Sequence, residues 1–386
     1  MSEWKKVKLG EVCEISAGGD RPQIFSNHRT DKCRIPIYSN GIDNEGLYGF
    51  TDTPKNNGNA ITITGRGANA GTVFYRKDPF LSIIRLLTLT PNSEIINAKY
   101  LFYLLKNKTF LSTGSAQPQI TVPNISQFEI EFNPDIETQH RVATILSRYD
   151  SLIENYQKQI KLLEEAAQRL YKEWFVDLRF PGHENTNIID GVPEGWEKKK
   201  VKEVCDTTSG GTPSRSKTEF YTGDILWVKT KELNDDFIFD TEEKITEDAI
   251  RNSSAKMVPS GSILMAMYGA TIGKLGIATK ELSCNQACCV FLLPEDSTLR
   301  LYLYNWLLNS RTLLISMGKG AAQPNLSQDM IKNLEVVIPS SCLLAKFDSK
   351  VKPLYRIMSY HSFQLRLLTE ARDRLLPKLM SGEIEI

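Results

Sequence analysis

The segment WKKVKLGEVC at residues 4–13 decides the fold of this chain, because it returns as WEKKKVKEVC at residues 196–205. Both copies open with a tryptophan and end in Glu-Val-Cys, and each then runs into a glycine pair, at 18–19 and at 210–211. A similarity that recurs after about half of a chain indicates that one structural unit is used twice. We therefore predict two globular domains of the same kind.

Two further pairs of segments follow in the same order. TGRGANAG at 64–71 corresponds to AMYGATIG at 266–273, and GSAQPQI at 114–120 corresponds to GAAQPNL at 320–326. Chance similarity would not preserve this order. The length of 386 residues also exceeds the size at which a single hydrophobic core usually stops growing.

The composition is that of an ordinary globular protein, with 41% hydrophobic and 24% charged residues. No uncharged apolar run approaches the roughly 20 residues that a membrane span needs, and the first residues lack the apolar stretch of a signal peptide. We therefore expect a cytoplasmic protein with no membrane segment. Seven cysteines, an odd number, indicate reduced thiols rather than a disulfide framework.

Each copy ends in a long apolar stripe with alternating steps of three and four residues. The first stripe runs from Val142 to Trp174 and the second from Phe347 to Leu375. Such a stripe is also typical of the core of a helical domain, but two equivalent stripes favour a coiled-coil pair. Since the second helix must return toward the first, the pair is predicted to be antiparallel. Pro377, followed by Gly382, is predicted to end the second helix.

Short β-prone runs separated by Gly, Asn, Asp and Pro turns fill the rest of each copy, together with helical segments near 100–107 and 302–309. The predicted fold class is α+β, with two similar globular domains joined by two long antiparallel coiled-coil helices in a pseudo-two-fold repeat. The predicted boundaries are 1–136 for the first domain, 137–178 for the first helix, 179–340 for the second domain, and 341–386 for the second helix and tail.

A search for catalytic motifs finds no phosphate-binding loop, no dinucleotide fingerprint and no metal-binding His-Glu-x-x-His helix. Of the four histidines, His361 lies on the second stripe and is predicted to be a packing residue. The cluster Cys284, Cys288 and Cys289 lacks the paired spacing of a zinc site. We predict no catalytic residue and no metal site in this chain.

The glycine-rich repeats are candidates for reading DNA, although a tight turn between strands would explain their glycines equally well. The two copies keep the glycines and change the residues around them, as two domains with different targets would. Gln and Asn suit contacts to adenine, and Arg suits guanine. The candidate DNA-binding residues are Arg21, Arg66, Asn69, Gln117, Gln119, Arg215, Lys217, Tyr268, Thr271, Lys274, Lys319, Gln323 and Asn325.

The formal net charge of +1 gives no direct support for DNA binding. Local basic clusters occur at Lys5–Lys8 with Arg21 and at Lys198–Lys202 with Arg215 and Lys217, and a solvated face explains them as well as phosphate binding does. A protein that neutralises few phosphates binds DNA weakly alone and needs a partner to complete a basic cleft.

Taken together, these motifs resemble the specificity subunit of type I restriction–modification enzymes over essentially the whole chain. The resemblance rests on the glycine hairpin and the Ala-Gln-Pro loop of each copy, and on four further segments: ETQHRVA at 137–143, LYKEWFVD at 170–177, GVPEGW at 191–196 and LLPKLMSGEI at 375–384. One departure from the family pattern is Leu343-Leu344-Ala345 at the entry to the second helix, where the family usually has a Glu-Gln-like pair.

The resemblance implies two target recognition domains, each reading one half of a bipartite asymmetric sequence in double-stranded DNA, with the helices setting the unread spacer. It implies two methyltransferase (modification) subunits and two restriction/translocase subunits as partners. S-adenosylmethionine, ATP and Mg are expected on those partners, and none is expected on this chain. The alternative from a different class is a coiled-coil adaptor that spaces two protein-binding domains without nucleic-acid contact, and a third possibility is an unrecognised nuclease.

Overall fold

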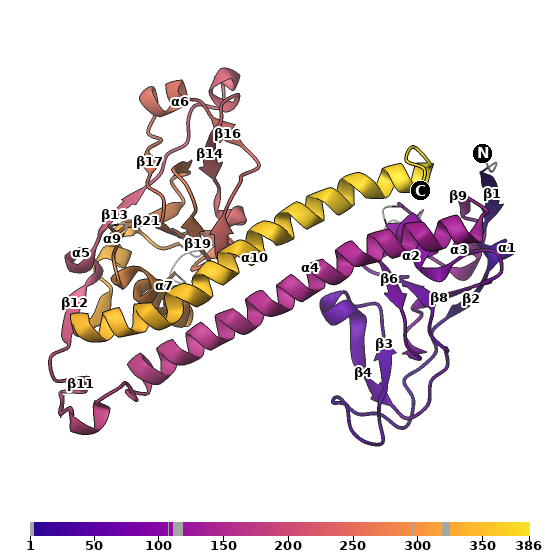
Figure 1. The fold of residues 1–386 in the computed structure, drawn as a ribbon, viewed down its shortest axis with the longest axis horizontal. Coiled ribbons are helices and arrows are strands. Elements are labelled where there is room, and N and C mark those ends of the chain that lie inside the picture. Colours follow the sequence, from indigo (N-terminus) through magenta and orange to yellow (C-terminus); the bar gives the residue numbers. More distant parts are fainter. Residues whose placement is uncertain (1–3, 107, 111–118, 295, 319–324) are drawn as a thin grey trace. The chain divides into compact units, whose positions relative to one another are not determined.

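The chain forms two compact units, unit 1 from Met1–Ile153 with Leu368–Ile386 and unit 2 from Glu154–Leu367. The computed structural model describes residues 4–106, 108–110, 119–294, 296–318 and 325–386. Figure 1 shows that each unit mixes strands with short helices and that two long helices, α4 and α10, run through the chain. The predicted α+β class with two similar domains and two long helices is confirmed.

Unit 1 begins with a strand and a one-turn helix, which together span most of the repeated Trp-to-Cys segment. Its elements are β1 (Lys5–Lys8), α1 (Leu9–Val12), β2 (Cys13–Ala17), β3 (Ile35–Tyr38), β4 (Leu47–Thr51), β5 (Ala60–Ile63), β6 (Val73–Arg76), β7 (Leu81–Ser82), β8 (Leu87–Pro91), α2 (Ala98–Lys106), α3 (Val122–Ser126) and β9 (Glu129–Phe132). They form a sheet of order β2-β8-β5-β6, a smaller sheet β4-β3-β7 and the pair β1-β9.

Unit 2 repeats this plan with additions. Its strands are β10 (Ile188–Ile189), β11 (Val192–Pro193), β12 (Glu197–Lys200), β13 (Asp206–Ser209), β14 (Ile225–Val228), β15 (Asp236–Ile238), β16 (Lys244–Ile245), β17 (Met257–Val258), β18 (Ile263–Ala266), β19 (Leu275–Ala278), β20 (Leu282–Cys284), β21 (Cys288–Leu292) and β22 (Glu335–Ile338). Its short helices are α5 (Val201–Val204), α6 (Glu247–Arg251), α7 (Leu299–Asn309), α8 (Arg311–Gly318) and α9 (Gln328–Lys332).

The sheet orders show the repeat directly. The order β13-β21-β18-β19 in unit 2 matches β2-β8-β5-β6 in unit 1, with β15 added at the edge. The pair β12-β22 matches β1-β9, and the parallel pair β14-β20 matches β3-β7. Every residue of the inner strands β5 and β18 is buried, and all but Thr62 are apolar. The internal duplication read from the sequence is therefore a duplication of the fold.

The long helices are α4 (Ile136–Tyr171) and α10 (Ser341–Ser381). Asp135 precedes α4 and accepts the Thr138 backbone N–H at 2.9 Å, which satisfies an unpaired donor of the first turn. Hydrogen bonds from Thr138 also hold the pKa of the Asp135 carboxyl below its usual value.

Within each unit, the segments of α4 and α10 pair in opposite directions. In unit 2 the Tyr156 ring lies 4.8 Å from His361, and Tyr171 lies 6.3 Å from Phe347. In unit 1 the Asp150 carboxylate lies 2.9 Å from Arg372. The prediction that His361 is a packing residue agrees with its ring contact to Tyr156.

The second helix is predicted to end at Pro377 followed by Gly382, and only the glycine marks its end: α10 continues through Pro377 to Ser381 and stops before Gly382, whose φ is +75°. Proline removes one N–H donor and crowds the preceding turn, but it does not forbid a helix. Leu376 and Leu379 on either side of Pro377 are buried against the core of unit 1, and this packing holds the last turn in place.

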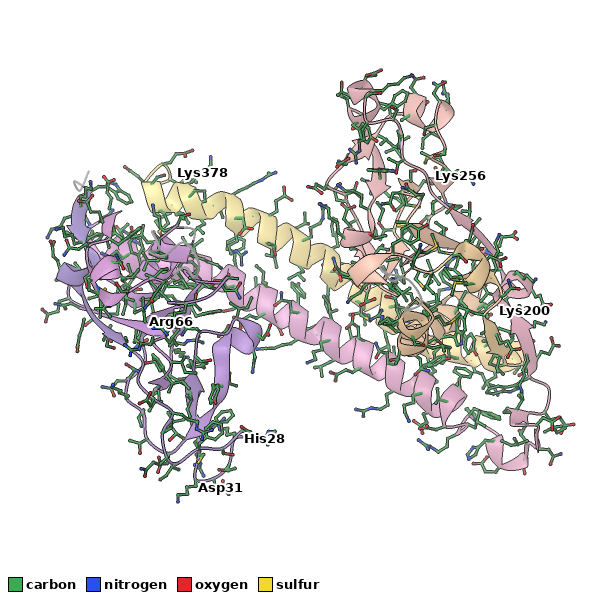
Figure 2. All side chains as sticks on the ribbon, turned by 180° about the vertical axis from the view of Figure 1, so that it is seen from behind. His28, Asp31, Arg66, Lys200, Lys256 and Lys378 are labelled. Carbon is green, nitrogen blue, oxygen red and sulfur yellow. The ribbon has the colours of Figure 1, made fainter. Side chains whose placement is uncertain are left out.

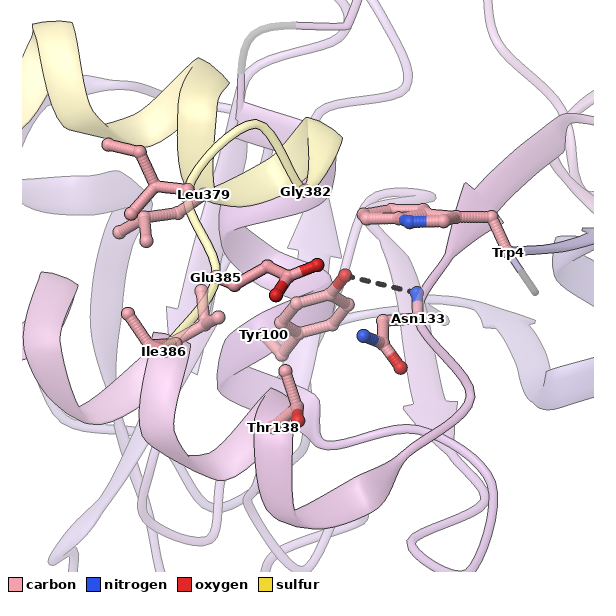
Figure 3. Close-up of a pocket in the computed structure, with 10 residues that line it drawn as sticks. Trp4, Tyr100, Asn133, Thr138, Leu379, Gly382, Glu385 and Ile386 are labelled. Carbon is pink, nitrogen blue, oxygen red and sulfur yellow. Dashed lines mark hydrogen bonds between the residues drawn. The ribbon is translucent and has the colours of Figure 1, made fainter. Parts of the chain in front are cut away.

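The two repeated tryptophans cover the ends of the long helices. In unit 2, Trp196 packs on Phe180 and Phe175, just after α4. In unit 1, Trp4 packs so closely on Gly382 that an added Cβ there would lie 2.9 Å from the indole ring. A cavity of about 330 Å³ lies beside Trp4, and Tyr100 and C-terminal residues such as Leu379 and Ile386 line it. Figure 3 shows these lining side chains.

Candidate nucleic-acid interface

The glycine-rich segment of unit 1 is the turn that joins β5 to β6. The Thr64 hydroxyl accepts the Thr72 N–H at 2.9 Å, and the Asn69 carbonyl accepts the Thr72 hydroxyl at 2.9 Å. Gly67 and Gly71 have φ values of +85° and +97°, a region that L side chains rarely adopt. The turn thus explains the glycines, and it leaves Arg66 and Asn69 exposed at its tip.

A distant segment pairs with this turn. The backbones of Arg66 and Gln119 form an antiparallel bridge, and the Ile120 N–H donates to the Gly65 carbonyl at 2.8 Å. The structure therefore brings together the glycine hairpin and the end of the Ala-Gln-Pro loop, as one edge of unit 1. Gln117 lies outside the described residues.

Unit 2 builds the same edge with other side chains. Tyr268 bridges Asn325, and the Leu326 N–H donates to the Met267 carbonyl at 2.9 Å. The Thr271 hydroxyl donates to the Tyr268 carbonyl at 3.1 Å, so this side chain holds the turn. Lys319 and Gln323 lie outside the described residues.

The glycine pairs of the repeat lie against the chain that precedes β8 or β21. A Cβ on Gly18 would stand 2.7 Å from the Ile83 nitrogen, and one on Gly210 would stand 1.9 Å from the Cys284 carbonyl oxygen. Glycine is therefore required for this close approach of two backbones. Each glycine pair thus packs on the segment that leads into β8 or β21, the strand next to β5 or β18 in its sheet.

Three other candidates lie elsewhere in their units and contact aromatic rings. Arg21 stands over Phe25 at 5.0 Å, and Lys217 over Phe220 at 4.8 Å. Arg215 pairs with Glu243 at 2.6 Å and stacks on Tyr221 at 4.3 Å. The hydrogen bond to Glu243 raises the pKa of Arg215. These side chains follow the glycine pairs along the chain and do not join the hairpin edge in the contacts described.

Lys274 is tied into an ion-pair network within unit 2. Its ammonium lies 2.7 Å from Asp235, which also pairs with Arg311 and accepts the Leu275 N–H at 3.0 Å. Asp235 has a φ of +67°, so the network holds a strained backbone position. Lys274 therefore has a structural partner within unit 2.

The lysine-rich start of each copy forms a strand whose neighbour carries acidic residues. In β1, Lys6 lies 2.6 Å from Glu129 of β9, and Lys8 stands opposite the same glutamate in the register. The hydrogen bond that the Lys6 ammonium donates to the Glu129 carboxylate raises the pKa of Lys6. In unit 2, Lys200 faces Glu335. Each cluster therefore has an acidic residue on the neighbouring strand.

Sequence reasoning missed three residues at the hairpin edge of unit 1. The Asn40 side chain accepts the Gly65 N–H at 2.7 Å and donates to the Ile84 carbonyl. Ile84 and Arg85 are exposed, and both have positive φ. The glycine pair at 18–19 was the one available signal of a close approach, but nothing in the sequence identified its neighbours.

In the part of the chain that the structure describes, no group of three or more His, Cys, Asp or Glu could hold a metal ion. Cys284, Cys288 and Cys289 are buried. None of the helices in the described ranges combines the length and the apolar character that a membrane crossing needs.

The protein is built by internal duplication of one α+β unit. Each copy pairs a hairpin turn with a later loop through the same backbone bridge but with different side chains, and each copy is followed by a long helix. The sequence profile of the type I restriction modification DNA specificity domain matches residues 1–165 and 193–341. The chain therefore belongs to the family of type I restriction–modification specificity subunits.

Named relatives agree with this assignment. The MjaIX specificity subunit of Methanocaldococcus jannaschii is 29% identical over 84% of this chain and 78% of its own length. The HindI specificity subunit of Haemophilus influenzae is 25% identical, with full coverage of both chains. The crystal structure of a type I restriction–modification S subunit from M. genitalium matches with a TM-score of 0.69 at 16% identity, over 98% of this chain and 96% of the other, which shows a common fold.

Proposed function

We propose that each globular domain reads one half of a bipartite asymmetric sequence in double-stranded DNA, and that the long helices fix the length of the unread spacer. The observation that carries the proposal is the doubled hairpin edge, Arg66 with Gln119 and Tyr268 with Asn325. The same backbone frame with different exposed side chains is what two readers of different half-sites need.

The chain acts in this proposal without catalytic residues of its own. Two methyltransferase subunits supply S-adenosylmethionine chemistry, and two restriction/translocase subunits supply ATP and Mg chemistry. The near-neutral charge of +1 fits a reader whose partners provide most of the phosphate contacts.

The exposed apolar side chains of α10 support docking of a protein partner on the helices. Ile357, Tyr360, Phe363 and Leu367 are all exposed, and their steps of three and four residues place them along one side of the helix. Large exposed apolar patches rimmed by polar residues mark protein interfaces. We assign this side of α10 in unit 2 to a methyltransferase subunit.

The first experiment expresses the chain with a type I methyltransferase subunit in a host that lacks such a system, and maps methylated bases by long-read sequencing. A gapped two-part motif is expected. Exchange of residues 1–134 for those of another family member should change only one half of the motif. Absence of both co-purification and gapped methylation would contradict the proposal.

The docking surface has its own test. Tyr360→Glu should weaken co-purification of the methyltransferase subunit at least tenfold while the chain stays folded. Lys350→Glu changes an exposed charge elsewhere on α10 and serves as the matched control.

The same exposed face of α10 also favours the coiled-coil adaptor as a second candidate. An adaptor predicts that the assembled complex binds DNA weakly or not at all. A specificity subunit predicts affinity that falls linearly with salt on logarithmic axes, with a steep negative slope.

A further inference from the structure

Two adjacent residues of unit 1, Ile84 and Arg85, adopt the left-handed backbone conformation. Their φ values are 52° and 60°. A β-branched residue with positive φ is a clear outlier, because its Cβ crowds the following carbonyl oxygen. Glycine or asparagine would occupy this position with less strain. The isoleucine side chain is nevertheless 50% exposed, so burial in the core does not account for its presence.

Hydrogen bonds hold this turn from several directions. The Ile84 N–H donates to the Gly19 carbonyl at 2.8 Å, and the Arg85 N–H donates to the Gly18 carbonyl at 3.0 Å. The Asn40 amide donates to the Ile84 carbonyl and accepts the Gly65 N–H at 2.7 Å. The surroundings therefore fix the direction in which the two side chains leave the turn.

The turn lies beside the hairpin that carries Arg66. The Arg85 carbonyl oxygen would stand only 3.1 Å from a Cβ on Gly65, the residue that precedes Arg66. Figure 2 shows Arg66 well away from the tip of unit 1 where His28 and Asp31 lie. Ile84 and Arg85 thus extend the edge formed by Arg66 and Gln119.

Arg66 and Arg85 are both exposed, and neither forms an ion pair with any residue in the described ranges. By contrast, Arg34 of unit 1 pairs with Asp31 at 3.1 Å and Arg76 pairs with Glu45 at 3.1 Å. Two guanidinium groups without counter-ions on one edge suit a partner that supplies hydrogen-bond acceptors. A guanine base offers two such acceptors, O6 and N7, at a spacing that matches the parallel N–H donors of arginine.

We propose that the Ile84–Arg85 turn is a base-reading element of the first domain, in which Arg85 specifies a guanine and Ile84 makes an apolar contact such as that with a thymine methyl group. This inference rests on the proposed function. A phosphate contact needs only a cation within reach, whereas a bidentate base contact needs a side chain whose Cα position and direction are fixed. The hydrogen-bonded turn fixes the backbone from which the Ile84 and Arg85 side chains extend.

The equivalent place in unit 2 has a different chemistry. The Met267 N–H donates to the Ala287 carbonyl at 2.9 Å, so Gln286 and Ala287 occupy the position of Ile84 and Arg85. No residue from 285 to 287 has positive φ, and Gln286 hydrogen-bonds to Thr212. The guanine contact is therefore assigned to the first domain alone.

The experiment compares Arg85→Ala, Arg85→Lys and Ile84→Gly in the assembled methyltransferase complex, with Arg34→Ala as the matched control. Methylated motifs are mapped by long-read sequencing, and binding is measured on the cognate duplex and on duplexes with one base pair changed. Arg85→Ala should reduce discrimination at one guanine position of one half-site by roughly 10- to 100-fold. Arg85→Lys keeps the positive charge but loses the two parallel N–H donors of the guanidinium group. Discrimination at the same base position should therefore fall, while the slope of log affinity against log salt stays as in the wild type.

Ile84→Gly relieves the backbone strain, so its melting temperature should equal or exceed that of the wild type. Discrimination in the same half-site should nevertheless fall. A stable variant with an unchanged motif would overturn the role of Ile84. For Arg85, an unchanged motif, or an equal loss of affinity on all sequences with a shallower salt slope, would overturn base reading. A wild-type complex that yields no gapped methylation motif would instead overturn the proposed function itself.

Discussion

Arg66 and Gln119 are joined by an antiparallel backbone bridge in unit 1, and Tyr268 and Asn325 form the same bridge in unit 2. Each bridge links a hairpin turn to a segment some fifty residues later in the chain. The frame is common to both units, and the exposed side chains are not. A mutation can therefore change the exposed side chains of one unit's edge without altering the other unit's edge.

Arg66→Ala should relax the methylated motif in one half-site, and Tyr268→Ala should affect only the other. The expected loss is about 1–3 kcal/mol of discrimination at one position if the side chain contacts a base. Long-read methylation mapping of the two variants measures both effects. Changes in the same half-site from both variants would contradict the assignment of one half-site to each domain.

Asn40→Ala should destabilise unit 1 by about 1–3 kcal/mol, because the buried Gly65 N–H then loses its acceptor. Denaturant unfolding followed by circular dichroism measures the change. Asn27→Ala, an exposed substitution in the same unit, is the control and should stay within about 0.5 kcal/mol of the wild type. Equal stability of both variants would show that the Asn40 bridge contributes little.

Glu164 gives unit 2 a dependence on pH. Burial, followed by repulsion from Asp236 and Asp235, raises the pKa of this carboxyl from 4.5 to about 7. The folded chain therefore binds more protons than the unfolded chain between about pH 4.5 and 7, and stability falls as pH rises through this range.

Glu164→Gln should remove that loss and stabilise the protein at pH 8 by about 1 kcal/mol, a value reduced for the partial exposure of the side chain. Melting temperatures at pH 5 and pH 8 test this. Glu154→Gln changes an exposed glutamate of α4 and should leave both temperatures unchanged. A Glu164→Gln variant less stable than the wild type at pH 8 would contradict the prediction.

Arg372→Met should destabilise unit 1 by about 1–3 kcal/mol, because the Asp150 carboxylate then loses its ion pair and keeps the hydrogen bond from the Tyr103 hydroxyl at 2.6 Å and the weaker attraction of Lys106. Arg374→Met removes a more exposed arginine of the same helix and should cost no more than about 0.5 kcal/mol. Chemical denaturation of the two variants provides the comparison, and equal values would show that the Asp150 pair is not a stabilising contact.

Local sequence patterns were sufficient for the helices and for the duplication. The apolar stripe from Val142 to Trp174 predicted α4, because one buried face of a helix recurs every three to four residues whatever its partner. Gly382 correctly marked the end of α10, whereas Pro377 did not, since the rule that proline ends a helix ignores the burial of Leu376 and Leu379 around it. Arg215 was identified as a basic residue, but the sequence could not show that Glu243 is its partner.

The sequence by itself determined that one α+β unit occurs twice and that the two copies keep their glycines while changing the residues beside them. Periodicity and repetition are properties of neighbouring residues, and they can be read along the chain. Only the tertiary structure decided which side chains share an edge. Asn40, Gly65, Ile84 and Gln119 come together through hydrogen bonds between distant segments, and the strained backbone at Ile84 and Arg85 exists only because those contacts hold it.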